Sequence, residues 1–188
     1  MSSNYFVSES SPFYINGKID FKSYMNNLRN LDNSITDNID FFIYMIGIND
    51  MKNNSTTTDQ IITNINNLIS ALKNDYPNVK IIIGYSPNAC SADGWSVHFK
   101  TRSSYTIFKN NMIKLECVLN NYVNSLENVY LCNSSHFIDK IYGYPYINES
   151  VSSRSTEEVL MHTDSVHPNE NGYGQLADAF FATVKALV

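Results

Sequence analysis

The sequence has 188 residues, a formal net charge of −5 and a pI near 5.2. Its 43% hydrophobic and 16% charged residues are typical of a globular chain with one core. The acidic balance, without a Lys/Arg cluster, argues against nucleic acid as a partner, and no apolar run is long enough for a membrane helix. We therefore expect a single domain over residues 1–188 that binds neither nucleic acid nor a membrane.

The first half of the chain contains three periodic segments. A weak helical pattern covers Phe21 to Leu31, and a short continuous apolar run from Asp40 to Ile46 predicts a buried strand. From Asp59 to Leu72 apolar residues recur on one face at helical spacing, with Thr58 or Asp59 placed to cap the first turn.

The second half continues this alternation. Strands are expected at Val79 to Ile83 and Val129 to Cys132, and helices at about Tyr105 to Leu126 and Asn171 to Leu187. On the last helix the pattern turns Tyr173 and Phe181, among others, inward. Strands that alternate with helices of this length indicate an α/β fold, a three-layer α/β/α sandwich around a parallel, flavodoxin-like sheet.

Two loops are longer than a crossover requires, Ser86 to Ser104 and His136 to Thr163. Both follow the carboxyl end of a strand, where ligands bind in open α/β sheets. They contain aromatic residues that suit stacking on a sugar, although covering the core is the commoner use of such side chains: Trp95, Tyr142, Tyr144 and Tyr146.

A carboxylate and a histidine lie three residues apart just before the last predicted helix. Across a tight turn, Asp164 can reach the Nδ1–H of His167, which fixes the tautomer and leaves Nε2 available as a base. The competing interpretation is an ordinary turn with a surface histidine.

The residues Gly47-Ile48-Asn49-Asp50 follow the first predicted strand. An asparagine amide at this position can donate a hydrogen bond to a developing oxyanion, and Gly47 allows substrate to approach the backbone there. Taken alone, the segment is more typical of an ordinary turn that ends a strand.

Together the two motifs resemble the SGNH (GDSL-type) hydrolase family, in which a Gly-x-Asn-Asp block ends the third strand and Asp-x-x-His-Pro precedes the final helix. The resemblance runs from about Phe41 to Val188 and includes Gly172-Tyr173. It implies an ester hydrolase without a cofactor or metal, in which His167, Asp164 and Asn49 are catalytic residues and Gly47 serves the oxyanion site.

The family's Gly-Asp-Ser block, which carries the nucleophilic serine, does not occur in the sequence. Ser86 is a poor substitute because Pro87 has no N–H for an oxyanion hole, and Ser165 would have to fold back within its own turn. We expect an upstream nucleophile, a sheet that lacks its first strand, an N-terminally incomplete domain and attachment to further domains upstream.

The remaining residues that often bind metals are expected to be structural. His98, His136 and His162 lie in or beside the long loops without metal-ligand spacing, so they are interpreted as exposed or loop-packing residues, with His162 a weaker candidate for the site. The three cysteines, Cys90, Cys117 and Cys132, are interpreted as small core residues.

Two functions remain open from the sequence. The first is a serine hydrolase of small-molecule or carbohydrate esters that acts through an acyl-enzyme. The second is a catalytically inactive SGNH-like module for ligand binding, or a structural part of a larger surface or virion protein. The complete set of Asp164, His167 and Asn49 favours the first. The sequence assigns no cellular location.

Overall fold

The computed structural model describes residues 2–52, 56–90, 98–99 and 101–188. Contacts divide the chain into two compact units, the first formed by Met1–Gly84 and Lys114–Leu131, the second by Tyr85–Ile113 and Cys132–Val188. The expectation of a single domain stays a prediction. Among the described residues, no helix is long and apolar enough to cross a membrane.

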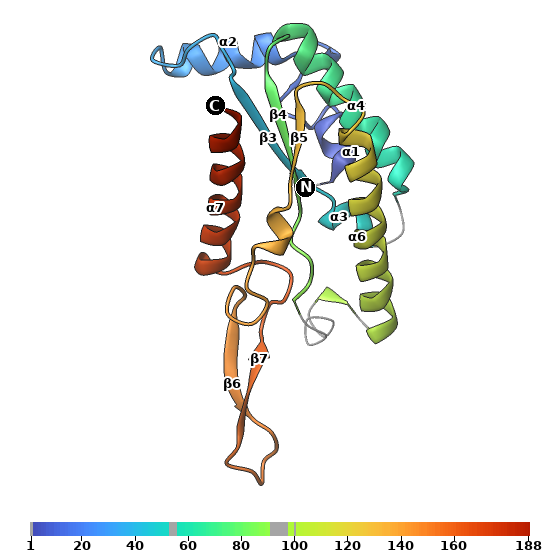
Figure 1. Cartoon of the computed structure of the whole chain (residues 1–188), viewed down its shortest axis with the longest axis vertical. Coiled ribbons are helices and arrows are strands. Elements are labelled where there is room, and N and C mark those ends of the chain that lie inside the picture. Colours follow the sequence, from blue (N-terminus) through green and yellow to red (C-terminus); the bar gives the residue numbers. More distant parts are fainter. Residues whose placement is uncertain (1, 53–55, 91–97, 100) are drawn as a thin grey trace. The chain divides into compact units, whose positions relative to one another are not determined.

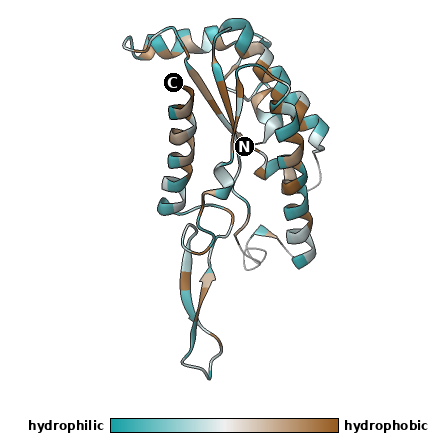
Figure 2. Cartoon of the chain, in the orientation of Figure 1, coloured by the Kyte–Doolittle hydropathy of each residue, from teal (hydrophilic) through white to brown (hydrophobic). Residues whose placement is uncertain are grey.

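The first unit is built on a three-stranded parallel sheet. It consists of β3 (Phe41–Ile46), β4 (Lys80–Tyr85) and β5 (Val129–Cys132) in the order β3-β4-β5 (Figure 1). These strands are short apolar runs, and they are among the hydrophobic parts of the chain in Figure 2. The central strand β4 is buried on both faces, as its continuous apolar run predicts, whereas Ile43 and Met45 on one face of β3 are exposed. The α/β fold class is confirmed.

Four helices of this unit are α1 (Ser3–Phe6), α2 (Phe21–Leu31), α3 (Ile48–Met51) and α4 (Thr58–Asp75). Both α1 and α2 contact α4. The buried face of α4 confirms the helical spacing read from the sequence and includes Ile61, Ile65, Leu68, Ile69 and Leu72. The cap was predicted at the wrong residue: the side chain of Thr57 accepts from the backbone N–H of Gln60.

A short hairpin precedes α2. Strands β1 (Tyr14–Ile15) and β2 (Lys18–Ile19) pair antiparallel around Asn16 and Gly17, whose φ angles are +52° and +83°. Two consecutive positive φ values are what the tight turn of a hairpin requires, and asparagine and glycine tolerate them best. Gly17 is therefore a turn residue, as the sequence indicated.

In the second unit the loop expected from His136 to Thr163 contains regular structure, so that expectation is wrong in part. After a 3-10 turn, η2 (Ser134–His136), strands β6 (Tyr146–Ser150) and β7 (Glu158–His162) pair antiparallel as a two-stranded arm (Figure 1). Every residue of β6 is exposed. Without a buried face, the alternation that signals a strand has no reason to appear in the sequence.

The two long helices match their patterns to different degrees. Helix α6 (Arg102–Val123) begins in the second unit and continues into the first, and it buries Phe108, Met112, Leu115 and Leu119 as expected. Helix α7 (Glu170–Leu187) buries Leu176 as expected, together with Gly172 and Ala179. The inward placement of Tyr173 and Phe181 is wrong, because both are exposed and two small residues, Gly172 and Ala179, pack beside Leu176.

The cysteines are core residues only in part. Cys132 is buried at the end of β5, Cys90 is partly buried, and Cys117 is exposed on α6. The interpretation of Cys117 as a core residue is therefore wrong. A solvent-facing position on a helix accepts small polar and small apolar side chains alike. The residue type of Cys117 therefore could not show that it is exposed.

Candidate active site

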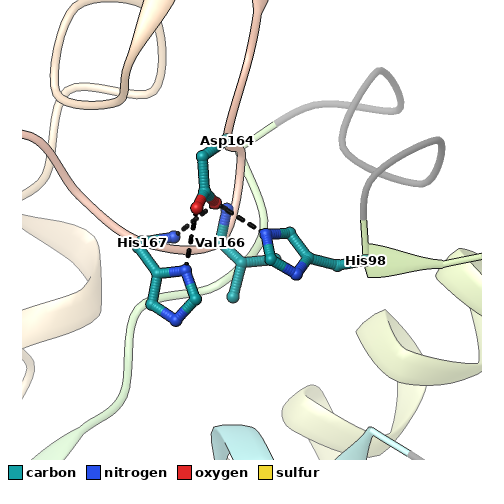
Figure 3. A network of polar contacts seen from close by, with 4 residues as sticks. All are labelled: His98, Asp164, Val166 and His167. Atoms are coloured by element: carbon teal, nitrogen blue, oxygen red, sulfur yellow. Dashed lines mark hydrogen bonds and ion pairs between the residues drawn. The ribbon is translucent and has the colours of Figure 1, made fainter.

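The turn Asp164–His167 lies in the second unit between β7 and α7. Asp164 Oδ1 accepts hydrogen bonds from the backbone N–H groups of Val166 and His167, both at 2.9 Å, and Oδ2 lies 2.9 Å from His167 Nδ1 (Figure 3). The predicted carboxylate–imidazole pair is therefore present. Its geometry is local, since the short Asp164 side chain accepts from the amides two and three residues further on and still reaches the His167 ring.

The two partners differ in exposure. The side chain of His167 is 64% exposed and that of Asp164 is 28% exposed. Within the described part of the chain, His167 Nε2 has no hydrogen-bond partner. A histidine held through Nδ1 with Nε2 accessible is oriented to take a proton from a group outside this turn.

Asp164 is held in its charged form. Partial burial disfavours ionisation, but the backbone N–H groups of His167 and Val166 and the imidazoles of His167 and His98 outweigh it and lower the pKa of this carboxyl well below its usual value. An ionised carboxylate can stabilise an imidazolium that forms beside it.

A second histidine completes the cluster, contrary to the sequence-based interpretation. His98 Nε2 lies 2.8 Å from Asp164 Oδ1, and the rings of His98 and His167 meet edge to face with centroids 5.2 Å apart (Figure 3). His98 is thus not merely a loop-packing residue. Nothing in its sequence context indicated this contact, because the two partners are 66 positions apart.

Backbone contacts hold the turn in place. The Cys90 N–H donates to the Ser165 carbonyl at 3.0 Å, and the Asn169 side chain donates to the carbonyls of Tyr142 and Tyr144. Asn169 also caps α7 by accepting from the Gly172 N–H at 3.0 Å. The segment around Tyr142 therefore supports the residues that follow His167.

The segment Gly47–Asp50 lies in the first unit, directly after β3. Gly47 has φ +127°, which side-chain-bearing residues rarely adopt, and it is the N-cap of the short helix α3. Asn49 is exposed on this helix. The expectation that Asn49 points into the same cleft as His167 stays a prediction.

Asp50 is buried and hydrogen-bonded, whereas its neighbour Asn49 is exposed. Asp50 is 1% exposed and accepts hydrogen bonds from the Ser3 backbone N–H at 2.9 Å and the Ser3 hydroxyl at 2.7 Å. The Asn64 amide donates to the same hydroxyl at 3.0 Å. This buried network, which the sequence analysis missed, fixes α1 against the end of β3 and uses both functions of the Ser3 hydroxyl.

The described serines include no hydroxyl bonded to His167. Ser86 is 2% exposed at the end of β4, and Ser165 is fully buried with no hydrogen-bond partner for its Oγ among the described residues. Both positions are poorly accessible to an ester. The sequence-based rejection of these two residues agrees with their burial.

None of the other described candidates hydrogen-bonds Asp164. His162 is buried in β7 with its Nε2 2.9 Å from the Ile141 carbonyl, and His136 is exposed, with its ring near Tyr85. Tyr144 is buried, whereas Tyr142 and Tyr146 are exposed with ring centroids 5.7 Å apart. Trp95 lies outside the described residues.

The Asp164 cluster has atoms that could also hold a metal ion. One nitrogen each from His98 and His167 and one Asp164 oxygen lie within 4.8 Å of one another. Two imidazoles and a carboxylate would suit a transition metal. In the structure these side chains hydrogen-bond one another, His98 Nε2 with Oδ1 and His167 Nδ1 with Oδ2 of Asp164.

Comparisons with known proteins show the family to which the chain belongs. The sequence matches the family described as GDSL-like Lipase/Acylhydrolase over residues 14–180, and the chain belongs to this family. No curated protein matches the sequence.

Solved structures with the same fold are distant in sequence. A carbohydrate esterase family 3 protein from Talaromyces cellulolyticus has 14% identity and a TM-score of 0.59, and the match covers 100% of this chain and 68% of that one. A protein from Streptococcus pneumonia, provisionally named a platelet activating factor, has 14% identity and a TM-score of 0.55, with 77% and 59% covered. This chain thus spans less than two thirds of the length of the second protein.

Proposed function

We propose that the chain is the greater part of a serine esterase that acts through an acyl-enzyme. The observation that carries the proposal is the Asp164–His167 pair, a charged carboxylate on Nδ1 with Nε2 accessible. In this proposal His167 is the general base and Asp164 orients it. Asn49 donates to the oxyanion, with Gly47 leaving room for the substrate at the backbone.

The proposed reaction has two halves. A serine Oγ attacks the ester carbonyl carbon while its proton moves to His167 Nε2, and the tetrahedral oxyanion forms beside Asn49. The intermediate collapses, the carbon–oxygen bond to the alcohol breaks, and the alcohol leaves with the proton from His167. Water then attacks the acyl-serine by the same route and releases the acid.

The nucleophile in this proposal lies outside the 188 residues. The Gly-Asp-Ser block of the family does not occur in the sequence, and no described serine contacts His167. In flavodoxin-like sheets the first strand lies beside the third, so a serine at its carboxyl end would be next to the Gly47–Asp50 segment. In the structure, Asp50 of this segment accepts a hydrogen bond from the Ser3 backbone N–H.

We further propose a carbohydrate ester as the substrate class. The exposed pair Tyr142 and Tyr146 offers aromatic faces, and the Tyr142 carbonyl accepts a hydrogen bond from Asn169, two residues after His167. One protein of the same fold is itself named a carbohydrate esterase. In this proposal the aromatic pair stacks on the sugar ring while the acetyl group reaches the base.

The activity is tested with p-nitrophenyl acetate on two proteins, the 188-residue chain and a form extended upstream. The extended form should hydrolyse the ester and lose this activity with His167→Ala, whereas the shorter chain should be nearly inactive. Activity of the shorter chain that His167→Ala abolishes would place the nucleophile within these residues. An extended form that binds acetylated sugars without cleaving them would support the inactive binding module instead.

The substrate class is tested in the active, extended form with Tyr146→Ala. The variant should raise KM for an acetylated oligosaccharide and leave the hydrolysis of p-nitrophenyl acetate unchanged, because the small ester has no sugar ring to stack. Phe181→Ala, which removes an exposed aromatic ring from α7, is the matched control. Equal KM changes in both variants would contradict a stacking role.

A further inference from the structure

We propose that Asn169 is a positioning residue that fixes an aromatic segment, residues 139–146, to the start of α7 and thereby sets the affinity for the sugar part of the substrate. The inference rests on the proposed function, because its ligand is the carbohydrate ester proposed above. Asn169 follows the base turn, Asp164–His167, and acts on the sugar through Tyr142 and Tyr146.

The side chain of Asn169 forms hydrogen bonds in two directions. Its Oδ1 accepts from the Gly172 N–H at 3.0 Å, which caps α7, and its Nδ2 donates to the carbonyls of Tyr142 and Tyr144 at 2.9 Å and 3.0 Å. A helix cap requires only the acceptor, which aspartate or serine supplies as well. Among side chains of this length, only an amide adds two donor hydrogens. The aromatic segment, and not the helix alone, therefore explains an asparagine at this position.

The helix also holds the aromatic segment at other points. The Asp139 N–H donates to Gln175 Oε1 at 2.8 Å, and the Asn169 backbone N–H donates to the Gly143 carbonyl at 3.0 Å. Within the segment, the Gly143 N–H donates to the Asp139 carbonyl at 2.9 Å, and Asp139 Oδ1 accepts from the Tyr142 N–H at 3.1 Å. The backbone that carries the Tyr142 ring is therefore a closed turn fixed to α7.

Hydrogen bonds tie the two exposed tyrosines to both flanks of the base turn. Thr163, directly before this turn, donates its N–H to the Pro145 carbonyl at 2.9 Å, one residue before Tyr146. Asn169, after the turn, donates to the Tyr142 carbonyl. Exposed rings on a backbone that is already fixed lose little conformational entropy when a ligand binds, and this raises the affinity.

The base turn itself does not depend on the Asn169 side chain. Asp164 Oδ1 accepts from the N–H groups of Val166 and His167 at 2.9 Å, and Oδ2 lies 2.9 Å from His167 Nδ1. In the described part of the chain, the Asn169 side chain forms no hydrogen bond with these residues. Loss of the amide should therefore disturb the aromatic segment and leave the base in place.

The test is the Kd of acetylated xylotetraose for the whole 188-residue chain, measured by isothermal titration calorimetry. Asn169→Ser keeps an acceptor for the helix cap but removes both donors to the segment, so it should raise Kd about five- to tenfold. Asn169→Asp turns an oxygen toward the two carbonyls and should raise Kd at least as much. In a chain that already carries Tyr142→Ala and Tyr146→Ala, Asn169→Ser should have little further effect.

The matched control is Asn171→Ser, which makes the same exchange at an exposed position in the first turn of α7 and should leave Kd unchanged. In the active, extended form, Asn169→Ser should raise KM for acetylated xylotetraose and change kcat/KM for p-nitrophenyl acetate by no more than about twofold. A merely structural role would affect both esters alike.

Amide hydrogen exchange measures the hold on the segment without any ligand. In Asn169→Ser the N–H groups of Tyr142 and Gly143 should exchange about tenfold faster or more, whereas the Gly172 N–H, which a serine still caps, should stay protected. Unchanged exchange at Tyr142 and Gly143 would contradict the positioning role.

An unchanged Kd in Asn169→Ser, an equal rise in Asn171→Ser, or no binding of acetylated xylotetraose would also overturn the inference. The proposed esterase would stand in that case if the extended form still loses its hydrolysis of p-nitrophenyl acetate with His167→Ala. If Kd depends on Asn169 but His167→Ala leaves hydrolysis intact, the proposed esterase mechanism fails while the positioning role of Asn169 stands.

Discussion

At the scale of single residues, the Asp164 carboxylate contributes to stability as well as to the site. Four hydrogen bonds converge on it from two backbone amides and two imidazoles. A group whose pKa is lowered on folding stabilises the folded state at any pH above its unfolded-state pKa. The stabilisation is lost as pH falls below this value toward the lower pKa of the folded state.

Asp164→Asn should therefore lower the urea midpoint at pH 7, and the difference from the unmodified chain should shrink below about pH 4, where Asp164 begins to take up a proton in the unfolded chain. The measurement is a series of urea denaturation curves between pH 7 and pH 3. A difference that stays constant over this range would show that the charge of Asp164 does not support the turn.

Asn49 should influence kinetics rather than stability in the extended, active enzyme. Asn49→Ala removes one oxyanion donor and should lower kcat by roughly a hundred- to a thousandfold with little change in KM. The reason is that the amide meets negative charge only when the tetrahedral intermediate forms. A raised KM with unchanged kcat would mean ground-state binding, and a lower Tm with intact kinetics would support the turn interpretation of Gly47–Asp50.

The residues of the site were predictable to the extent that their geometry is local. Asp164 and His167 are three positions apart, so a turn alone brings them together. His98 reaches the same carboxylate from 66 positions away, and Ser3 reaches Asp50 from 47 positions away. Such contacts depend on the tertiary fold, and no spacing in one sequence reports them.

At the scale of elements, α7 is placed by a close backbone approach. A Cβ on Gly172 would lie 2.2 Å from the Gly143 carbonyl oxygen, nearer than real Cβ atoms come to any neighbour. The same carbonyl accepts from the Asn169 N–H at 3.0 Å. Only a residue without a side chain lets the helix begin this close to the segment that supports the turn.

Gly172→Ala should therefore lower Tm, although alanine is the better helix former by about 1 kcal/mol. The matched control is Gly174→Ala on the same helix, where a Cβ would meet nothing within 4 Å. That control should leave Tm unchanged or raise it slightly. A rise of Tm in both variants would show that the contact with Gly143 relaxes at little cost.

Elements were predictable where one face is buried. The spacing on α4 and α6 matches their buried faces because a one-sided apolar stripe can be read from the sequence. The hairpin β6–β7 was missed because its strands have almost no buried face. On α7 the large side chains of Tyr173 and Phe181 were predicted to face the core because they are apolar. The packed face instead includes the small residues Gly172 and Ala179.

At the scale of the whole molecule, the position of β3 in the sheet bears on whether chains associate. It lies at one end of the strand order, and no described strand pairs with its other edge. Tyr44 and Ile46 are buried on one face, whereas Ile43 and Met45 on the opposite face are 47% and 39% exposed. An apolar strand at a sheet edge invites pairing with another chain, and exposed apolar side chains increase that tendency.

We therefore expect the 188-residue chain to self-associate as its concentration rises, through β3. Met45→Lys places a charge on the exposed face of the strand and should shift the equilibrium toward the monomer, measured by sedimentation velocity over a range of concentrations. Leu31→Lys is the matched control, because Leu31 is 85% exposed at the end of α2, away from the sheet. If both variants reduce association equally, general surface charge rather than the strand is responsible. If an upstream extension abolishes association as completely as Met45→Lys does, the added segment covers β3, as the proposed first strand of the family would.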